Sequence, residues 1–280
     1  MAVWILTDSA SDMPADNGLN VRVLPLTVTF GEVSYLDGVT LTKDEFYRKL
    51  EQEKELPKSS MISPAAFEEA YQKLPAGDEA VVVALSSKLS GTCYAATLAA
   101  EDFSNVHVVD SLNASAGQRV LVHYAAMLRD KGLAAADIAA RLMEKRADVR
   151  FGAVLDTLEY LKRGGRISAG TALVGSMLNI KPLIAVQDGS VAMLDKVRGF
   201  KKGCKQLVEW VRSGGGIATN LPFYLAYTGI SNKAVREFAA ENAALWPGRE
   251  EHLAFSRVGS VIGTHIGPHA LGLAYFAQKS

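Results

Sequence analysis

Hydrophobic and polar positions alternate with two different periods in the first half of the chain. Short apolar runs at 3–6, 80–85 and 106–109 predict strands, and the second run is apolar throughout, as in a buried parallel sheet. Segments with helical periodicity follow or precede these runs, at 43–53, 63–74, 91–100, 117–130 and 133–147. This alternation is typical of an α/β domain with a mostly parallel sheet and helices on both faces.

Three local signals refine the predicted elements. Thr42 and Glu45 have the spacing of a capping box at a helix start. Ser63-Pro64 predicts another start, because proline is well accommodated in the first helical turn. The segment 21–30 alternates but contains Pro25, which predicts one strand that lies at a sheet edge or carries a bulge.

The pattern changes near residue 150. Asp188-Gly189 separates two apolar runs and predicts a two-residue hairpin. We expect strands at 151–155, 183–187, 190–198, 223–228 and 270–276, and helices that end near 162 or span 200–212 and 232–245. The prediction is therefore two domains: residues 1–150 as an α/β domain, and residues 151–280 as an α+β domain with a mixed or antiparallel sheet.

The segment 169–178 is helical in pattern and carries no charge. A helix that is apolar all round belongs in a core or against an apolar ligand. A core position is the commoner case, so the segment is predicted to be buried.

Composition excludes several classes of protein. The chain has 280 residues, with 30 Lys plus Arg and 30 Asp plus Glu, which argues against nucleic acid as a partner. Cys93 and Cys204 are the only cysteines, too few for a disulfide framework, and no metal-ligand spacing occurs. No apolar run is long enough to span a membrane, and residues 1–12 are too short and too acidic for a signal peptide. We therefore expect a cytoplasmic protein.

Small polar residues follow three of the predicted strands, at Asp8-Ser9, Ser86-Ser87 and Asp110-Ser111. Ligands of α/β proteins bind at such carboxyl ends of strands. Ser90, Gly91 and Thr92 stand where a helix is predicted to begin, and free N–H groups there favour an anion. The simpler interpretation is that Ser90 caps the helix.

A nucleophilic role for Ser90 is the enzymatic alternative. It requires a base, and His265 is the best candidate because VIGTHIGPH (261–269) places it between glycines, where an irregular backbone is expected. His107 and His123 fall within a strand and a helix and are predicted to be structural. No G-x-S-x-G motif and no obvious orienting acid occur, which disfavours a serine hydrolase or acyltransferase.

The loop RGGRIS (163–168) is compact and basic. Arg166 could bind a carboxylate or phosphate with two hydrogen bonds. Arg163 fits equally well as a cation at a helix C-terminus that stops at glycine.

Taken together, several motifs resemble those of one family, and they occur in order over nearly the whole chain. These motifs are TDSASD (7–12), LDGVTLTKDEFY (36–47), KSSMISP (58–64), LSSKLSGT (85–92), VVDSLNASAGQ (108–118), LEYLKRGGRIS (158–168), KPLIAV (181–186), VRGFKKG (197–203) and IGTHIGPHALGLAY (262–275). The sequence resembles the DegV family, including the fatty-acid-binding subunits of bacterial fatty acid kinase.

The resemblance implies a two-domain binding protein that has no catalysis and no cofactor of its own. It implies one bound long-chain fatty acid, with the carboxylate near the domain junction and the chain in an apolar tunnel formed with the second domain. A separate ATP-dependent kinase is implied to phosphorylate the carboxylate to an acyl phosphate for phospholipid synthesis. Peripheral contact with a membrane during lipid exchange is compatible with this role.

The resemblance also implies roles for individual residues. Ser90 of LSGT is expected to bind the carboxylate, with His265 of GTHIGP completing the cluster and Arg166 close by. Ser59 stands where the family usually has threonine. Thr92 and Thr264 are expected in the same cluster, and Arg198 of VRG is expected to serve the kinase encounter or the acyl phosphate.

Three departures from the family pattern bear on these roles. Met61-Ile62 replaces Gln-Pro, which makes that loop more apolar. His269 replaces a glycine, so a positive φ there would be strained. Cys93 replaces tyrosine, a change expected to alter packing. A regulatory protein that responds to a bound lipid is the remaining alternative, which the sequence does not separate from a carrier.

Overall fold

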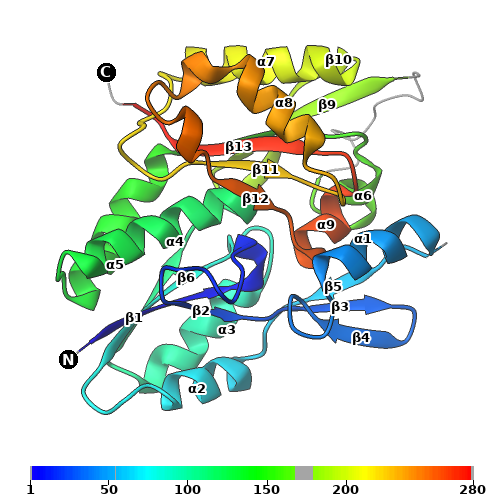
Figure 1. The fold of residues 1–280 in the computed structure, drawn as a ribbon. Helices are drawn as coiled ribbons and strands as arrows, with labels where there is room; N and C mark the ends of the chain where they lie inside the picture. Colours follow the sequence, from blue (N-terminus) through cyan, green and yellow to red (C-terminus); the bar gives the residue numbers. More distant parts are fainter. Residues whose placement is uncertain (1, 54, 168–178, 279–280) are drawn as a thin grey trace.

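The computed structural model of the chain describes residues 2–53, 55–167 and 179–278. The first half forms a four-stranded parallel sheet in the order β2-β1-β6-β7. Its strands are β1 (Val3–Asp8), β2 (Val21–Leu24), β6 (Glu79–Ala84) and β7 (Val106–Asp110). Helices cover both of its faces, as predicted, with α4 (Ser115–Asp130) and α5 (Ala135–Lys145) on one and α2 (Pro64–Gln72) and α3 (Thr92–Ala99) on the other (Figure 1).

The second half forms a six-stranded mixed sheet in the order β10-β9-β8-β13-β11-β12. Only β11 and β12 are parallel neighbours within it. Its strands are β8 (Val149–Val154), β9 (Ile180–Gln187), β10 (Ser190–Arg198), β11 (Tyr224–Tyr227), β12 (Phe255–Arg257) and β13 (Leu271–Phe276). This confirms the mixed sheet expected after residue 150, while the boundary at 150/151 itself stays a prediction.

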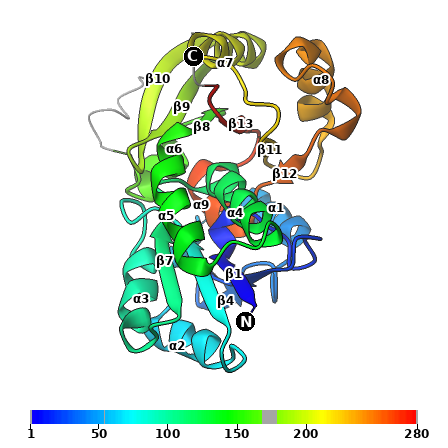
Figure 2. The same cartoon turned by 90° about the vertical axis from the view of Figure 1, so that its left-hand side faces the viewer.

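The two sheets are stacked with α4 and α5 between them, and α7 (Phe200–Ser213) and α8 (Lys233–Glu241) cover the outer face of the second sheet (Figure 2). One continuous apolar core joins both sheets. It contains Val83 and Val109 of the first sheet, Leu121 of α4, and Phe151 and Phe276 of the second. Burial of this shared core holds the two halves in a fixed relation.

A small antiparallel sheet, in the order β4-β3-β5, stands beside the first sheet. It consists of β3 (Thr27–Phe30), β4 (Val33–Leu36) and β5 (Lys58–Ser60), and α1 (Lys43–Gln52) lies against it. The prediction of one strand over 21–30 is wrong. Residues 21–24 and 27–30 are separate strands in different sheets, because Pro25 has no N–H to continue a ladder.

The local signals at element ends are confirmed. The hydroxyl of Thr42 accepts from the backbone N–H of Glu45, and Glu45 accepts from the N–H of Thr42, which completes the capping box. Ser63 caps α2 with Pro64 in the first turn. Asp188 and Gly189 have φ values of 47° and 82°, as a tight two-residue hairpin requires.

Two predictions for the second half of the chain are wrong. The segment around His265 is a helix, α9 (Ser260–Ile266), rather than irregular backbone. Gly263 lies inside that helix, and a side chain at this position would clash with Phe46, which explains the glycine there. Gly267 ends the helix with a φ of 72°. The helix predicted over 232–245 stops at Glu241, and a separate 3₁₀ turn covers 243–245.

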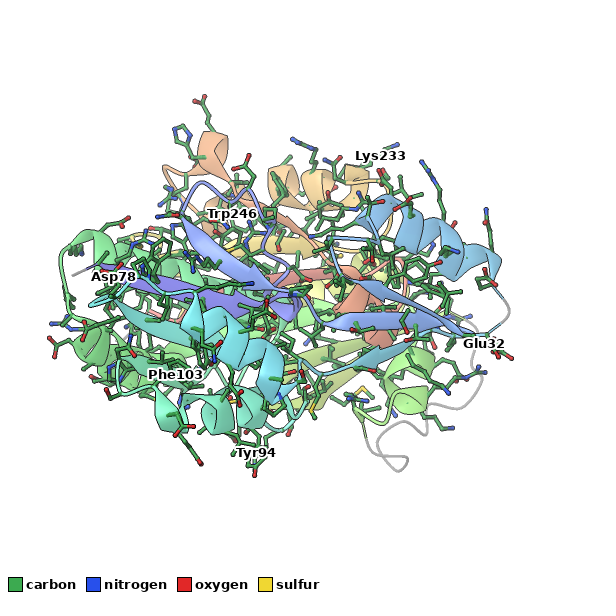
Figure 3. All side chains as sticks on the ribbon, turned by 90° about the horizontal axis from the view of Figure 1, so that it is seen from below. Glu32, Asp78, Tyr94, Phe103, Lys233 and Trp246 are labelled. Atoms are coloured by element: carbon green, nitrogen blue, oxygen red, sulfur yellow. The ribbon has the colours of Figure 1, made fainter. Side chains whose placement is uncertain are left out.

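Tyr94 projects from α3 with 71 % of its surface exposed (Figure 3). The uncharged segment predicted to be a buried helix, 169–178, falls outside the described residues. Among the helices of the described ranges, none has the length and apolar character needed to cross a bilayer.

Candidate functional site

A largely apolar cavity lies where the two halves meet the small sheet. Space not filled by protein atoms amounts to about 760 Å³ there, part of it open to solvent. The second sheet, β5 of the small sheet, α9 and the loops after β5 and β6 contribute to the wall. Its apolar residues are Leu26, Met61, Leu85, Leu89, Ala114, Phe151, Ala153, Leu155, Leu161, Ile184, Val186, Val191, Val261, Ile262 and Ile266.

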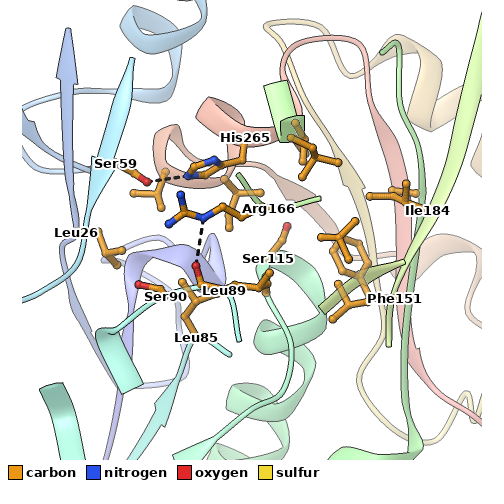
Figure 4. A pocket seen from close by; sticks show the side chains of 18 of the residues that line it. Leu26, Ser59, Leu85, Leu89, Ser90, Ser115, Phe151, Arg166, Ile184 and His265 are labelled. Carbon is orange, nitrogen blue, oxygen red and sulfur yellow. Dashed lines mark hydrogen bonds between the residues drawn. The ribbon is translucent and has the colours of Figure 1, made fainter. Parts of the chain in front are cut away.

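Four of the residues singled out in the sequence line this cavity: Ser59, Ser90, Arg166 and His265. They gather at one side of it, whereas Ile184 and Phe151 stand at the other (Figure 4). The chain therefore brings two hydroxyls, a guanidinium and an imidazole from four separate segments to one end of an apolar space.

Ser59 and His265 are directly joined. The Oγ of Ser59 on β5 lies 2.7 Å from the Nε2 of His265 in the last turn of α9. The other ring nitrogen, Nδ1, is buried and has no hydrogen-bond partner among the described residues. A Cβ on Gly164 would stand only 2.3 Å from that Nδ1, so the imidazole occupies this place because residue 164 lacks a side chain.

The imidazole of His265 is held in its neutral form. Burial and, to a lesser extent, the charge of Arg166 together lower its pKa from 6.5 to about 4. At neutral pH the ring is thus an uncharged hydrogen-bonding group, whereas Arg166 supplies positive charge to this end of the cavity.

Ser90 does not cap α3. The N-cap position is Gly91, which has no side chain to offer, so the capping interpretation is wrong in detail. The Oγ of Ser90 instead accepts from the backbone N–H of Thr92 at 3.2 Å and lies 3.0 Å from the Thr92 hydroxyl. This leaves Ser90 oriented by Thr92 and in contact with the cavity.

Arg166 is fixed by backbone oxygens. Its Nε donates to the carbonyl of Leu89 at 3.2 Å, and one terminal nitrogen donates to the carbonyl of Gly164. Arg163, by contrast, ends helix α6 (Glu159–Arg163) and pairs with Glu159 at the surface. The two arginines of the basic loop therefore have separate roles, and only Arg166 lines the cavity.

Three expected site residues do not line the cavity. Thr92 is buried behind Ser90. Thr264 donates to the carbonyl of Ser260 within its own helix at 2.8 Å. Arg198 is exposed at the end of β10.

The other two polar strand ends serve the backbone instead. Asp8 accepts from the N–H groups of Leu85 and Ala10, and Asp110 accepts from that of Leu112. His123 bonds to the hydroxyl of Tyr224, in keeping with a structural role. The loop that follows β6 reaches the cavity through Ser90.

Ser115 lines the cavity and was missed in the sequence. It is the first residue of α4, has a φ of 54°, and donates to the carboxylate of the buried Asp12. Its presence in the motif VVDSLNASAGQ was the available signal, but the helix was predicted to begin only at residue 117.

The geometry does not form a catalytic triad with Ser90. The serine bonded to His265 is Ser59, and the unpartnered Nδ1 shows that no acid orients the ring within the described residues. An imidazole whose pKa is lowered to about 4 is also a weak base near neutrality. Nor do the described residues contain a group of three His, Cys, Asp or Glu arranged to hold a metal ion.

Nearly the whole chain matches one family model. The model of the DegV family covers residues 2–278. The chain belongs to the DegV family. A DegV domain-containing protein of Caldanaerobacter subterraneus is 34 % identical over 284 residues, which cover 99 % of each chain.

Solved structures of other DegV proteins share the fold over full length. A DegV protein of Thermus thermophilus, described by its fatty acid binding, superposes with a TM-score of 0.87 at 31 % identity, over 99 % of this chain and 100 % of the other. DegV of Bacillus subtilis, a fatty acid binding protein, gives a TM-score of 0.85 at 28 % identity, with the same coverage.

One departure from the DegV pattern has a visible structural effect. His269 has a φ of 61°, in the left-handed region that favours glycine. The expected backbone strain at this position is therefore present.

Proposed function

We propose that this DegV protein binds one long-chain fatty acid, with its carboxylate beside Ser59, Ser90, Arg166 and His265 and its chain along the apolar wall. The observation that carries the proposal is the division of one cavity into a polar end and an apolar remainder. Fatty acid binding by similar DegV proteins supports it.

The polar end suits a carboxylate. We assign the proton of neutral His265 to Nε2, because the buried Nδ1 has no acceptor to receive one. His265 then donates to Ser59, and the Ser59 hydroxyl proton is free to donate to a carboxylate oxygen. Ser90 offers a second hydroxyl, and Arg166 balances the negative charge. Thr92 acts through Ser90, and Thr264 acts through the helix that carries His265.

The apolar remainder suits the acyl chain. Transfer of about 14 methylenes from water at about 0.8 kcal/mol each would contribute roughly 11 kcal/mol before the cost of ordering the chain. A ligand held by such a gain would stay bound through purification. No cofactor is needed for this role.

We further propose that the bound acid is presented to a separate ATP-dependent kinase. In that step a carboxylate oxygen attacks the γ-phosphorus of ATP, the bond to the β-phosphate oxygen breaks, and ADP leaves. The product is an acyl phosphate. Arg198 is exposed and forms no ion pair with the described residues, so it is available to meet the partner or the new phosphate.

Calorimetric titration of the delipidated protein with oleate tests the binding proposal. We expect one site per chain, weakened about tenfold by Ser90→Ala, because a hydrogen bond to a charged group is lost. Ser87→Ala is the matched control, since Ser87 is exposed and lies outside the cavity. An absence of oleate binding, or equal effects of the two substitutions, would contradict the proposal.

The presentation step needs its own assay. The oleate-loaded protein is incubated with ATP and an extract of the source organism, and hydroxylamine traps any acyl phosphate as the hydroxamate. We expect ATP-dependent hydroxamate that Arg198→Gln lowers and Arg212→Gln, at another exposed position, does not. Binding without any hydroxamate would favour the lipid-responsive regulatory role instead.

A further inference from the structure

A second hollow lies on the far side of the acyl-chain cavity. It leaves about 1430 Å³ unfilled by protein atoms, part of it open to solvent. It forms where β8 and β9 diverge: their ladder pairs Val154 to Gly152 with Leu183 to Ala185 and goes no further. Val186, just beyond the last pair, lines both the cavity and this hollow, which we call the rear groove.

Two arginines give the rear groove positive charge. Arg146, after α5, donates from one terminal nitrogen to the carbonyl of Asp110 at 2.6 Å. Arg150, on β8, donates from one terminal nitrogen to the carbonyls of Ala147 and Val149. These bonds fix both guanidinium groups, and neither forms an ion pair with a carboxylate of residues 2–53, 55–167 or 179–278. Asp188 at the rim is the one acidic residue of the described lining.

A buried hydroxyl in the same groove lacks a partner. Tyr275 on β13 is 0 % exposed, and its hydroxyl makes no hydrogen bond to any described residue. This oxygen lies 3.6 Å from the place a Cβ would take on Gly214, which also lines the groove. Buried hydroxyls are nearly always satisfied, so an unpaired one on a residue that lines a charged hollow indicates a missing partner. Burial raises the pKa of Tyr275 to about 12, which keeps the group a proton donor at neutral pH.

The groove also contains apolar and aromatic side chains, beside the polar Asn113 and Gln187. The indole of Trp210 on α7 packs edge-to-face on Tyr275, with ring centroids 6.2 Å apart. Met143, Val149 and Val186 add apolar surface to the lining. A flat apolar body can lie here while a charged end reaches the guanidinium groups.

We propose that the rear groove is a second ligand site, for a small anion carried on an aromatic or apolar body. Arg146 and Arg150 bind the anionic group, the hydroxyl of Tyr275 donates to the ligand, and Trp210 packs on its body. The site is separate from the fatty-acid cavity, and its existence does not depend on the proposed function.

Calorimetric titration with 2-naphthyl phosphate tests the site. The protein is first saturated with oleate, so that the probe does not enter the larger apolar cavity; if oleate does not bind, the titration is run on the chain as purified. We expect one site that binds 2-naphthyl phosphate at least tenfold more tightly than either inorganic phosphate or 2-naphthol. Inorganic phosphate lacks the aromatic body, and 2-naphthol lacks the anionic group. Equal binding of 2-naphthol would overturn the role of the arginines, and no binding at millimolar probe would overturn the site.

Three variants locate the binding. Arg146→Gln and Arg150→Gln should each weaken the probe about tenfold or more, as expected for a lost bond to a charged group. Arg141→Gln is the matched control, on the exposed side of α5. Tyr275→Phe removes only an unpaired hydroxyl, so it should leave or raise the melting temperature of the free protein and still weaken the probe severalfold. Unchanged probe affinity in all three groove variants would show that the probe binds elsewhere and would contradict the proposal.

Discussion

The Oγ of Ser59 lies 2.7 Å from the Nε2 of His265, although 206 positions separate the two residues in the sequence. This contact joins the small sheet to α9 and sets the polar end of the cavity. In our account it is a relay of hydrogen bonds to a carboxylate rather than a nucleophile and its base. That distinction gives the first prediction.

Ser59→Ala should weaken oleate binding about tenfold, because the carboxylate loses a donor and His265 loses its acceptor. Ser59→Thr keeps the hydroxyl and should bind within about twofold of the wild type. Titration calorimetry of the delipidated variants measures both. A covalent adduct of Ser59 or Ser90 with a fluorophosphonate would contradict the account, since it would reveal an activated nucleophile.

Gly164→Ala should displace the imidazole of His265, because the added methyl would meet Nδ1 at 2.3 Å. Overpacking of this kind lowers the free energy of unfolding by about 1–3 kcal/mol, and lipid affinity should fall as well. Chemical denaturation and oleate titration measure the two effects. The double variant Gly164→Ala/His265→Ala should recover stability relative to the sum of the single changes, and simple additivity would argue against the clash.

The neutral state of His265 makes its contribution to stability depend on pH. Its pKa is about 4 in the folded protein, below its ordinary 6.5, so between these values the unfolded chain binds a proton that the folded protein does not. The contribution of His265 to the free energy of unfolding is therefore complete above pH 6.5 and is lost as the pH falls toward 4. The free energy of unfolding of His265→Asn should therefore rise relative to that of the wild type by up to about 2 kcal/mol between pH 7.5 and pH 5. Denaturation at both pH values measures this difference.

Two buried carboxylates change the free energy of unfolding in the opposite direction over part of this pH range. Burial raises the pKa of Asp8 and of Asp12 to about 6, so their protonation stabilises the folded protein as the pH falls from 6 to 4. Both are present in the wild type and in His265→Asn, and the difference between the two proteins isolates the histidine. A constant difference at the two pH values would show that His265 titrates normally.

Val191→Phe should shift selectivity toward shorter fatty acids. Val191 lines the cavity on β10 and is not fully buried, so a larger ring can be accommodated while it shortens the space for the chain. Competition between laurate, palmitate and oleate, read by mass spectrometry of the extracted ligand, measures the change. Val33→Phe, at a position that is 54 % exposed and outside the cavity, is the control. An equal shift in chain-length selectivity in both variants would show that the cavity does not determine this selectivity.

Much of the fold follows from local chemistry in the sequence. Thr42 and Ser63 mark helix starts through their own hydroxyls, and Asp188-Gly189 fixes a hairpin by its φ values. Each of these signals acts within a few residues, so it can be recognised without the tertiary structure. Pro25 shows the limit: it marks a break, but only the sheets on either side decide that 21–24 and 27–30 pair with different partners.

The site depends on contacts that no local pattern contains. His265 seemed to lie in an irregular, glycine-rich loop, yet Gly263 packs α9 on Phe46 and permits a helix there. The match to DegV motifs selected Ser59, Ser90, Arg166 and His265, which the fold brings to one cavity. Thr264 and Arg198 came from the same motifs but lie outside it, because a motif includes residues that support helices and surfaces as well as ligands.

Mass spectrometry of the purified chain, first native and then after denaturing extraction, shows whether the cavity holds a fatty acid. We expect one long-chain fatty acid per chain, released on denaturation, with a mass that identifies the acyl chain the cavity selects. A protein that carries no lipid, and whose melting temperature is unmoved by added oleate or palmitate, would contradict the binding proposal.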